Sequence, residues 1–279
     1  MSYWRSGSSE WIYFLQCTDT HLRVSAEDTQ ARQSPQQGLS KIVQYALDSG
    51  LPLDFVLHTG DVAGALGELG QPSSYDECDQ LLAPLKKPVA YVAGNHDDPR
   101  ELRRRIPTAV EWFSDDPSSV AYSFQSGEIR FFVLDARIGE APHSRISEGQ
   151  LDWLHAGLGA IAKNGAAVVV THYQVLPIDI PRWHCVDYDG APSSMLMENG
   201  EALHAVLSRH RAVVAGVFHG HIHSSQAFTV DGVTYHAAPS TIDNVCNLPD
   251  DRAVDDTIGA NLVGIRPGSL LVRHLRLAR

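Results

Sequence analysis

The stretch AVVAGVFHGHIH, residues 212–223, decides the fold, because it joins an apolar run to two closely spaced histidines. Residues 212–218 are rich in β-branched side chains and are predicted to form a buried strand. Gly220 follows, and a glycine suits a backbone that passes close to a site. His221 and His223 then stand two residues apart. The stretch therefore predicts a strand that delivers two imidazoles to the end of a sheet, where they can bind one cation or two adjacent ones.

Four earlier apolar runs also end in side chains that can bind a metal or a substrate. The runs and the residues after them are 11–17 with Asp19 and His21, 53–58 with Asp61, 88–93 with Asn95, His96 and Asp97, and 166–170 with His172. The first three runs alternate with predicted helices, which is the pattern of parallel crossover units. The crossover rule then places their C-terminal ends at one edge of a sheet, where open α/β sheets bind ligands.

Helices are predicted where apolar side chains recur every three or four residues. They are a helix with Leu39, Ile42, Val43, Ala46 and Leu47 inward that ends at Gly50, and helices over residues 74–85, 101–105, 147–163 and 201–210. The arginines within residues 101–105 are interpreted as a solvated face. Ser147 and Gln150 have the spacing of a capping box.

Three hairpins and one long segment complete the predicted architecture. A hairpin within residues 121–134 leads to Asp135, and two more, over residues 227–237 and 262–275, are expected to form a second sheet. Residues 174–200 are rich in proline, glycine and aromatic side chains, which suits a lid over the site. With no repeat or clear boundary, one domain over residues 1–279 is expected, with the last hairpins in residues 226–279.

Composition limits the classes of protein that this chain can belong to. Its 279 residues are 43% hydrophobic and 20% charged, as in a globular protein. No run reaches the ~18 to 20 apolar residues of a membrane span, and the first ten residues lack the apolar core of a signal peptide, so a cytoplasmic location is expected. The net charge of −11 disfavours nucleic acid as a partner. The four cysteines lack CxxC spacing and fit buried, reduced thiols.

The polar residues at the five strand ends are too many for one tetrahedral metal site. The eight are Asp19, His21, Asp61, Asn95, His96, His172, His221 and His223. Any one alone is more often a cap or a surface residue, but together they suit two cations that share a carboxylate. Imidazole, carboxylate and carboxamide ligands without thiolate favour Mn²⁺, Fe²⁺, Co²⁺ or Zn²⁺. Two such ions can activate a water and clamp phosphoryl oxygens, which is the chemistry of phosphate ester hydrolysis.

These motifs resemble those of the calcineurin-like metallophosphoesterases. The blocks DxH, GD, GNHD, a lone His and GHxH, between Asp19 and His223, match the family's signature in order. The GNHDD-Pro stretch is most similar to the branch of bacterial cyclic-nucleotide and glycerophosphodiester phosphodiesterases. The resemblance implies an α/β fold in which two mixed β-sheets pack as a sandwich flanked by helices (α/β/β/α). It also implies two divalent metal ions.

The resemblance assigns a role to each motif residue. One metal would be held by Asp19, His21 and His223, the other by Asn95, His172 and His221, with Asp61 bridging them. Asn95 and His96 would contact substrate, and His96 would bind the phosphoryl oxygens or protonate the leaving group, oriented by Asp97.

The chain departs from the family pattern after the lone histidine. Tyr173 follows His172 where relatives often have a second histidine or a proline, and it either contacts substrate or packs under the lid. His219 is also additional and is interpreted either as a core histidine or as one that supports the site residues from behind. Trp183 and His184 in the predicted lid are candidates for substrate contact.

Several functions remain open at this point. The first is a binuclear metal-dependent phosphodiesterase acting on a small phosphodiester, either a cyclic nucleotide or a glycerophosphodiester. A phosphomonoesterase or a nucleotide pyrophosphatase could use the same site, and a nuclease is disfavoured by the acidic charge. A metal-free protein-binding scaffold is the alternative from another class. A homodimer or a larger homo-oligomer could form through the strand within residues 269–275.

Overall fold

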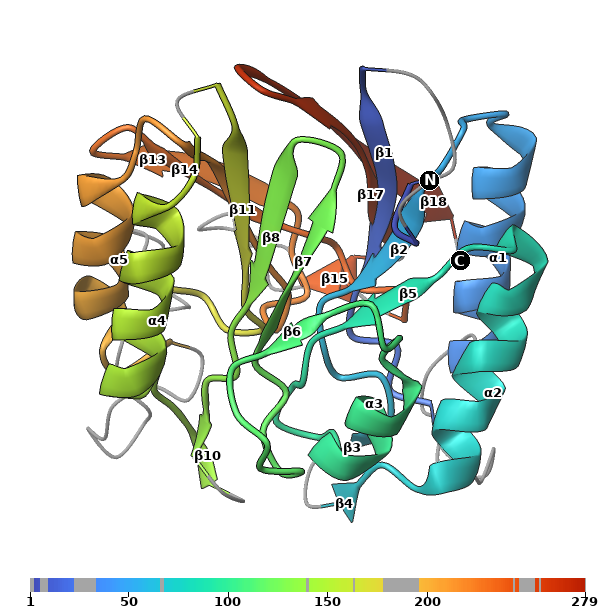
Figure 1. The fold of residues 1–279 in the computed structure, drawn as a ribbon. Helices are drawn as coiled ribbons and strands as arrows, with labels where there is room; N and C mark the ends of the chain where they lie inside the picture. The colour runs from blue at the N-terminus through green and yellow to red at the C-terminus, as the bar shows by residue number, and fades with distance from the viewer. Residues whose placement is uncertain are drawn as a thin grey trace.

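The computed structural model describes residues 3–5, 10–22, 34–65, 68–138, 141–162, 164–177, 196–242, 244–245, 254–255 and 257–278. Two β-sheets pack face to face between two pairs of helices (Figure 1). Helices α1 and α2 cover the outer face of one sheet, and α4 and α5 cover the outer face of the other. The four-layer α/β/β/α sandwich expected from the sequence is therefore confirmed.

The first sheet has five strands in the order β18-β17-β1-β2-β5. Their bounds are β1 Ile12–Cys17, β2 Phe55–His58, β5 Val89–Tyr91, β17 Thr257–Arg266 and β18 Ser269–Ala278. Strands β1, β2 and β5 run parallel, as the crossover pattern predicted, so their C-terminal ends meet at one edge. Strand β17 is antiparallel to β1 and carries the edge strand β18.

The second sheet has seven strands in the order β13-β14-β12-β11-β8-β7-β6. Their bounds are β6 Glu111–Trp112, β7 Tyr122–Ser126, β8 Ile129–Val133, β11 Ala166–Val170, β12 Val214–His219, β13 Gln226–Val230 and β14 Val233–Ala237. Strands β8, β11, β12 and β14 are parallel, so β11 and β12 also end at one edge.

The two last hairpins do not form a sheet together, and that expectation was wrong. Hairpin β13–β14 extends the second sheet, whereas β17–β18 extends the first. Strand β17 is buried from Ile258 to Ile265, as suits a strand inside a sheet rather than at a solvated edge. The second sheet is built instead on β8, β11 and β12.

The remaining elements are short strands and the helices. They are α1 Pro35–Asp48, α2 Pro72–Leu82, the 3₁₀ helix η2 Ala83–Leu85, α3 Pro99–Arg105, α4 Glu148–Gly159, α5 Gly200–Arg209, and the two-stranded pairs β3 Gly64–Ala65 with β4 Glu68–Leu69, β9 Arg137–Ile138 with β10 Ala141–Ser144, and β15 Asn244–Val245 with β16 Val254–Asp255. Helix α2 begins two residues before the predicted start, because Pro72 occupies its first turn. Leu47, predicted to face inward, is 44% exposed.

Aromatic side chains from both sheets fill the space between them. Phe14 stacks on Phe55, and the edge of Phe131 meets Phe14. Phe124 stacks on Phe131, with ring centres 4.8 Å apart. Such pairs add about 0.5–1.5 kcal/mol each to the burial of their area. This core fixes how the sheets face each other, and hence how their C-terminal edges meet.

The cysteines that the structure describes agree with the sequence prediction. Cys17 and Cys78 are free thiols and are buried. Burial raises the pKa of the Cys17 thiol to about 12, so the thiol stays protonated and unreactive. Cys185 and Cys246 lie outside the described residues. Within the described chain, no helix is long and apolar enough to span a membrane.

Arg103 and Arg105 of α3 are not part of a solvated face, contrary to the sequence interpretation, whereas Arg104 is exposed as expected. Arg103 donates to the carbonyl oxygens of Ser114 and Ser119 and lies over the Trp112 ring at 3.8 Å. Arg105, whose side chain is only 13% exposed, pairs with acidic groups of α2 and α3. These arginines therefore anchor α3, which follows directly after the GNHD motif.

Replacing Arg105 by alanine is expected to lower the free energy of unfolding by about 1–3 kcal/mol, because Glu101 is largely buried and loses charged hydrogen bonds. Arg104 also pairs with Glu101, but its side chain is 67% exposed, so Arg104→Ala should cost less than about 1 kcal/mol. Urea denaturation of the two metal-free variants measures both values. Equal small losses would show that Arg105 is no anchor.

Candidate metal centre

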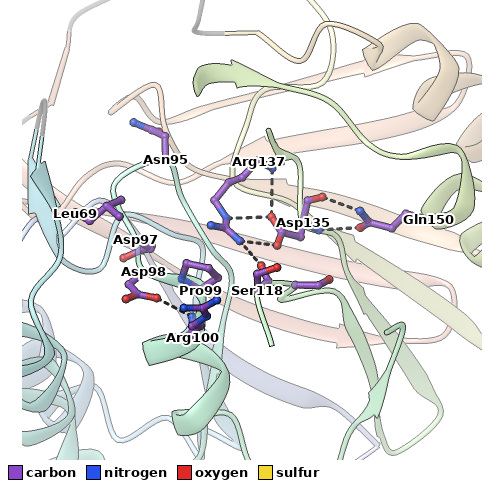
Figure 2. A pocket seen from close by; sticks show the side chains of 11 residues that line it. Leu69, Asn95, Asp97, Asp98, Pro99, Arg100, Ser118, Asp135, Arg137 and Gln150 are labelled. Carbon is purple, nitrogen blue, oxygen red and sulfur yellow. Dashed lines mark hydrogen bonds and ion pairs between the residues drawn. The ribbon is translucent and has the colours of Figure 1, made fainter. Parts of the chain in front are cut away.

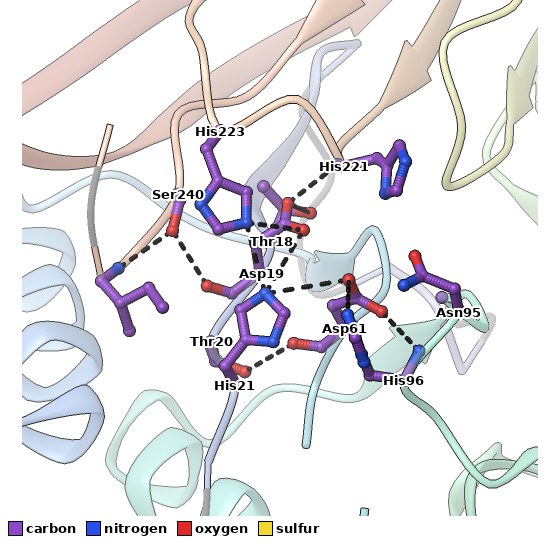
Figure 3. Close-up of polar contacts among 12 residues, drawn as sticks. Thr18, Asp19, Thr20, His21, Asp61, Asn95, His96, His221, His223 and Ser240 are labelled. Carbon is purple, nitrogen blue, oxygen red and sulfur yellow. Dashed lines mark hydrogen bonds and ion pairs between the residues drawn. The ribbon is translucent and has the colours of Figure 1, made fainter. Parts of the chain in front are cut away.

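The C-terminal edges of the two sheets meet at one place, and the motif residues gather there. Asp19 and His21 follow β1, Asp61 follows β2, and Asn95 and His96 follow β5, while His172 follows β11 and His221 and His223 follow β12. Figure 3 shows labelled side chains from the loops after β1, β2, β5 and β12 grouped together, with Asp61 between His21, His96 and Asn95. Residues as far apart in the chain as Asp19 and His223 thus form one polar cluster.

Five of the motif residues have a left-handed backbone. The φ angles are 52° for Asp19, 46° for His21, 51° for Asp61, 69° for His221 and 46° for His223. This region is unfavourable for residues other than glycine and costs on the order of 1–3 kcal/mol each. Backbone hydrogen bonds between the loops, such as Asp19 N–H to Gly60 O at 2.9 Å, hold the conformation. The turns point successive side chains into the same space.

A first group of ligand atoms surrounds Asp19. Its Oδ1 lies 3.3 Å from His223 Nε2 and 3.9 Å from His21 Nε2, and the two imidazole nitrogens are 3.2 Å apart. His21 Nε2 is also 3.7 Å from Asp61 Oδ2. Atoms held about 2.0–2.2 Å from one cation have such separations.

A second group of ligand atoms surrounds His172. Its Nε2 lies 3.3 Å from Asp61 Oδ2, 3.3 Å from Asn95 Oδ1 and 3.1 Å from His221 Nδ1. The other ring nitrogen, Nδ1, lies 2.8 Å from the Thr59 carbonyl oxygen, which fixes the ring and leaves Nε2 facing the group. Asp61 Oδ2 belongs to both groups, so the two ligand sets share one oxygen.

The chemistry of these atoms fits divalent cations. Asp19 Oδ1 is buried and has no hydrogen-bond partner among the described residues, whereas Oδ2 accepts hydrogen bonds from Thr18 Oγ1 and His221 N–H. Burial by itself would raise the pKa of Asp61, but His172 and His21 hold it well below its usual range. Both carboxylates are therefore ionised, and Asp19 Oδ1 faces the histidines as an orphaned ligand atom. Three overlapping clusters of histidine and aspartate can hold metal here.

Residues 12–225 match the model of the calcineurin-like phosphoesterases. The chain belongs to this family. It is 27% identical to a probable cyclic nucleotide phosphodiesterase from Psychrobacter arcticus, over 96% of this chain and 90% of the relative. It is 25% identical to the 3′,5′-cyclic adenosine monophosphate phosphodiesterase CpdA of Vibrio vulnificus, over 88% of this chain and 81% of the relative. A dimetal phosphatase from Danio rerio has the same fold, with a TM-score of 0.63, 18% identity, and 96% and 98% of the two chains covered.

The GNHD loop of this calcineurin-like phosphoesterase is held by Asp97. Its carboxylate, 1% exposed, accepts hydrogen bonds from the backbone N–H groups of Val62, Ala63 and Gly94. The sequence predicted that Asp97 orients the His96 ring. The structure instead places its carboxylate on the backbone beside Asp61, because three amide donors converge there, so it braces the loop that carries His96.

His96 lies beside the shared oxygen and is not fully buried. Its backbone N–H donates to Asp61 Oδ1 at 3.0 Å, and its ring Nε2 is 4.0 Å from Asp61 Oδ2. The side chain is 15% exposed, which leaves part of the ring accessible. It is thus placed to reach a group bound at the two ligand sets.

The remaining predicted residues have different outcomes. The Tyr173 ring is fully buried against the rings of His172 and His221, which agrees with the packing interpretation. His219 is also fully buried, and burial lowers its pKa to about 4, as expected of a core histidine. Trp183 and His184, with most of the predicted lid, lie outside the described residues.

Sequence reasoning missed a second group of polar residues beside Asn95. Arg137 and Gln150 hold Asp135 at the wall of a cavity of about 470 Å³, which Asn95 also lines (Figure 2). Asp135 follows the apolar run 129–134, the same signal that marked the metal ligands. Gln150 was assigned to a capping box: Ser147 Oγ does accept from Gln150 N–H, but the Gln150 side chain binds the Asp135 backbone instead.

Proposed function

We propose that this phosphoesterase is a metal-dependent phosphodiesterase that uses two divalent cations to hydrolyse a small phosphodiester, either a cyclic nucleotide or a glycerophosphodiester. The observation that carries the proposal is Asp61 Oδ2, which lies 3.7 Å from His21 Nε2 and 3.3 Å from His172 Nε2. One oxygen common to two ligand sets supports two cations that would share it, as in two-metal hydrolases, whose cations lie about 3.5–4 Å apart.

Seven residues would hold the two cations. Asp19, His21 and His223 would hold one, Asn95, His172 and His221 would hold the other, and Asp61 would serve both. When bound, the pair lowers the pKa of water and polarises phosphoryl oxygens. The ligand types suit Mn²⁺, Fe²⁺, Co²⁺ or Zn²⁺.

His96 would bind the substrate and supply a proton. Its backbone is tied to Asp61 Oδ1, so its position relative to the shared oxygen is fixed, and its ring is accessible. An imidazole there can donate to a phosphoryl oxygen or protonate the departing alcohol. Asp97 would contribute by keeping the loop rigid, through its hydrogen bonds to Val62, Ala63 and Gly94.

The names of the relatives support a cyclic nucleotide as the first substrate to test. All seven positions carry a residue type that can bind a metal ion, which counts against a metal-free scaffold. A phosphomonoesterase or a pyrophosphatase would use the same ligands, so only the preferred substrate distinguishes these enzymes from a phosphodiesterase. The homo-oligomeric state and the cytoplasmic location stay predictions.

The test is a hydrolysis panel on metal-stripped protein reconstituted separately with Mn²⁺, Zn²⁺ and Fe²⁺. The substrates are bis(4-nitrophenyl) phosphate, 4-nitrophenyl phosphate, cyclic AMP and glycerophosphocholine. Metal-dependent preference for the diesters is expected, and metal analysis should give two ions per chain. Preference for the monoester would make the protein a phosphatase, and no turnover with any metal would favour the scaffold.

Metal affinity is expected to rise with pH between 6.5 and 9. In the metal-free protein, burial opposes protonation of His172, but Asp61 outweighs it and raises the pKa of His172 to about 9. Only the neutral imidazole can be a ligand, so binding releases a proton below that pKa. Affinity should increase by up to about tenfold per pH unit and level off above pH 9. Titration calorimetry of Mn²⁺ in buffers of different ionisation enthalpy measures the released protons, and a pH-independent affinity would contradict the expectation.

A further inference from the structure

The cavity beside the metal centre has a polar wall that the proposed reaction does not use. Asn95 joins the cavity to the second ligand group, and Arg137, Asp135, Arg100, Asp98 and Ser118 line much of the remainder. Leu69 adds an apolar side. Figure 2 shows Arg137 between Asn95 and Asp135. A substrate whose phosphoryl group lies at the cations would place one of its two ester arms here.

Arg137 is held in the cavity wall with part of its guanidinium unused. Its Nε and Nη2 donate to the two oxygens of Asp135 at 3.1 and 2.7 Å, and Nη2 also donates to the Ser118 carbonyl oxygen at 3.0 Å. The side chain is 10% exposed. Nη1 donates to no group of the described chain, although a buried guanidinium usually has partners for its five N–H groups.

Asp135 is itself held by hydrogen bonds, so the ion pair between Asp135 and Arg137 has little freedom to move. Its Oδ2 accepts from the Val120 N–H at 2.9 Å. The Gln150 side chain binds both backbone groups of Asp135, accepting from its N–H at 2.9 Å and donating to its carbonyl oxygen at 2.8 Å. The guanidinium is therefore preorganised, and a ligand that meets Nη1 has little ordering cost to overcome.

The charges around the cavity select the kind of arm. Two carboxylates, those of Asp98 and Asp135, and two guanidinium groups, those of Arg100 and Arg137, line the cavity, while the Asp97 carboxylate is taken up by backbone amides. A second phosphate would meet the carboxylates, and a quaternary ammonium would meet the arginines. A neutral group with several hydroxyls can donate to the carboxylates and accept from Arg137 at the same time.

We propose that this cavity is the subsite for a neutral, hydroxyl-rich arm of the substrate, such as ribose or glycerol, and that Arg137 Nη1 recognises one of its hydroxyl oxygens. The inference rests on the proposed function, because it takes the scissile phosphate to lie at the two cations. Arg137 is then a specificity-determining residue for the retained arm and takes no part in the chemical step.

The test compares 4-nitrophenyl phosphodiesters that share the leaving group and differ only in the second arm, which is positively charged in the choline diester and neutral in the other three. The arms are methyl, choline, uridine (through its 5′ oxygen) and 2′,3′-dideoxyuridine. In Arg137→Lys, the ammonium can still pair with Asp135 but cannot also present a second nitrogen. The variant should lose about tenfold or more in kcat/KM for the uridine diester, and about twofold or less for the other three.

A second variant fills the cavity without changing the buried ion pair between Arg137 and Asp135, so it tests the subsite even if Arg137→Lys fails to fold. Leu69 is 43% exposed, so Leu69→Trp should fold and should weaken use of the uridine diester while leaving the methyl diester unchanged. Leu271→Trp, at a 58% exposed site on β18, and Arg130→Lys, at the Glu111 pair outside this cavity, are the matched controls. A glycerol arm in place of uridine distinguishes the two polyols.

Binding of uridine alone to the metal-free protein, measured by calorimetry, supplies a readout besides activity. Binding by the wild type that is lost in Arg137→Lys and in Leu69→Trp supports the subsite. Equal losses for all four diesters, no change for the uridine diester, or a loss confined to the choline diester would each overturn it. Failure of the wild type to hydrolyse even the methyl diester with any metal would refute the proposed function, and uridine binding would still decide the subsite.

Discussion

The Asp61→Asn variant is expected to lose hydrolysis by on the order of 10³-fold or more, because in the proposed two-cation centre this single change would remove an ionised ligand from both positions. Asp61 Oδ2 contributes to both ligand groups, and Oδ1 accepts the His96 N–H at 3.0 Å. Asparagine has only one acceptor oxygen, so its amino group must face either the His96 N–H or the cations. Metal content by elemental analysis and kcat/KM on a diester measure the two effects.

Asp54→Asn is the matched control for this variant. Asp54 is also buried, at 3% exposure, and its Oδ2 accepts a backbone N–H from Tyr13, but it precedes β2 at the opposite end from the metal centre. It should keep both metals and most of its activity. Full activity of Asp61→Asn with two bound metals would remove Asp61 from the centre.

The Gly94→Ala variant is expected to lose metal binding and about 1–3 kcal/mol of the free energy of unfolding, as in other overpacked sites. A Cβ at position 94 would overlap the backbone nitrogen and the Oδ1 atom of Asp61, neither of which can move without displacing the left-handed turn. The displacement would separate the two ligand groups. Calorimetric metal titration and urea denaturation of the variant measure both losses.

Gly159→Ala controls for the loss of a glycine. At position 159, near the end of α4, the closest atom to a new Cβ is His210 Cε1 at 3.7 Å, an ordinary contact. Alanine there should leave activity unchanged and stabilise the helix by about 1 kcal/mol or less. If Gly94→Ala also kept its metals and stability, the conclusion that a side chain at position 94 displaces the Asp61 turn would be wrong.

Local sequence patterns predicted that these histidines and aspartates would cluster, because each candidate ligand follows a short buried strand. The apolar runs before Asp19, Asp61 and Asn95 are visible in the sequence, and the crossover rule orients them without reference to their partners. What the patterns could not supply was the choice of neighbours. Strand β17 pairs with β1 rather than with β14 because of contacts between residues as distant as Ile12 and Ile265.

The side chains that brace the site were harder to predict than the ligands. Each of three such residues has a local interpretation in the sequence. Asp97 was expected to orient His96, Gln150 to cap a helix, and Arg105 to be a solvated charge. In the structure each is used by a segment elsewhere in the chain, such as the amides of Val62 and Ala63 for Asp97. The hydrogen-bond partners of a long polar side chain depend on which groups lie near it in the folded chain. A local sequence motif does not say which groups these are.

The pairing of β1 with β17 also sets an order on biosynthesis. A ribosome makes β1, which carries Asp19 and His21 at its end, long before it makes β17. Until then β1 has β2 on one side and unpaired backbone groups on the other, an edge that invites pairing with other nascent chains. The strand that leads to Asp19 and His21 therefore keeps one unpaired edge until β17 has been made.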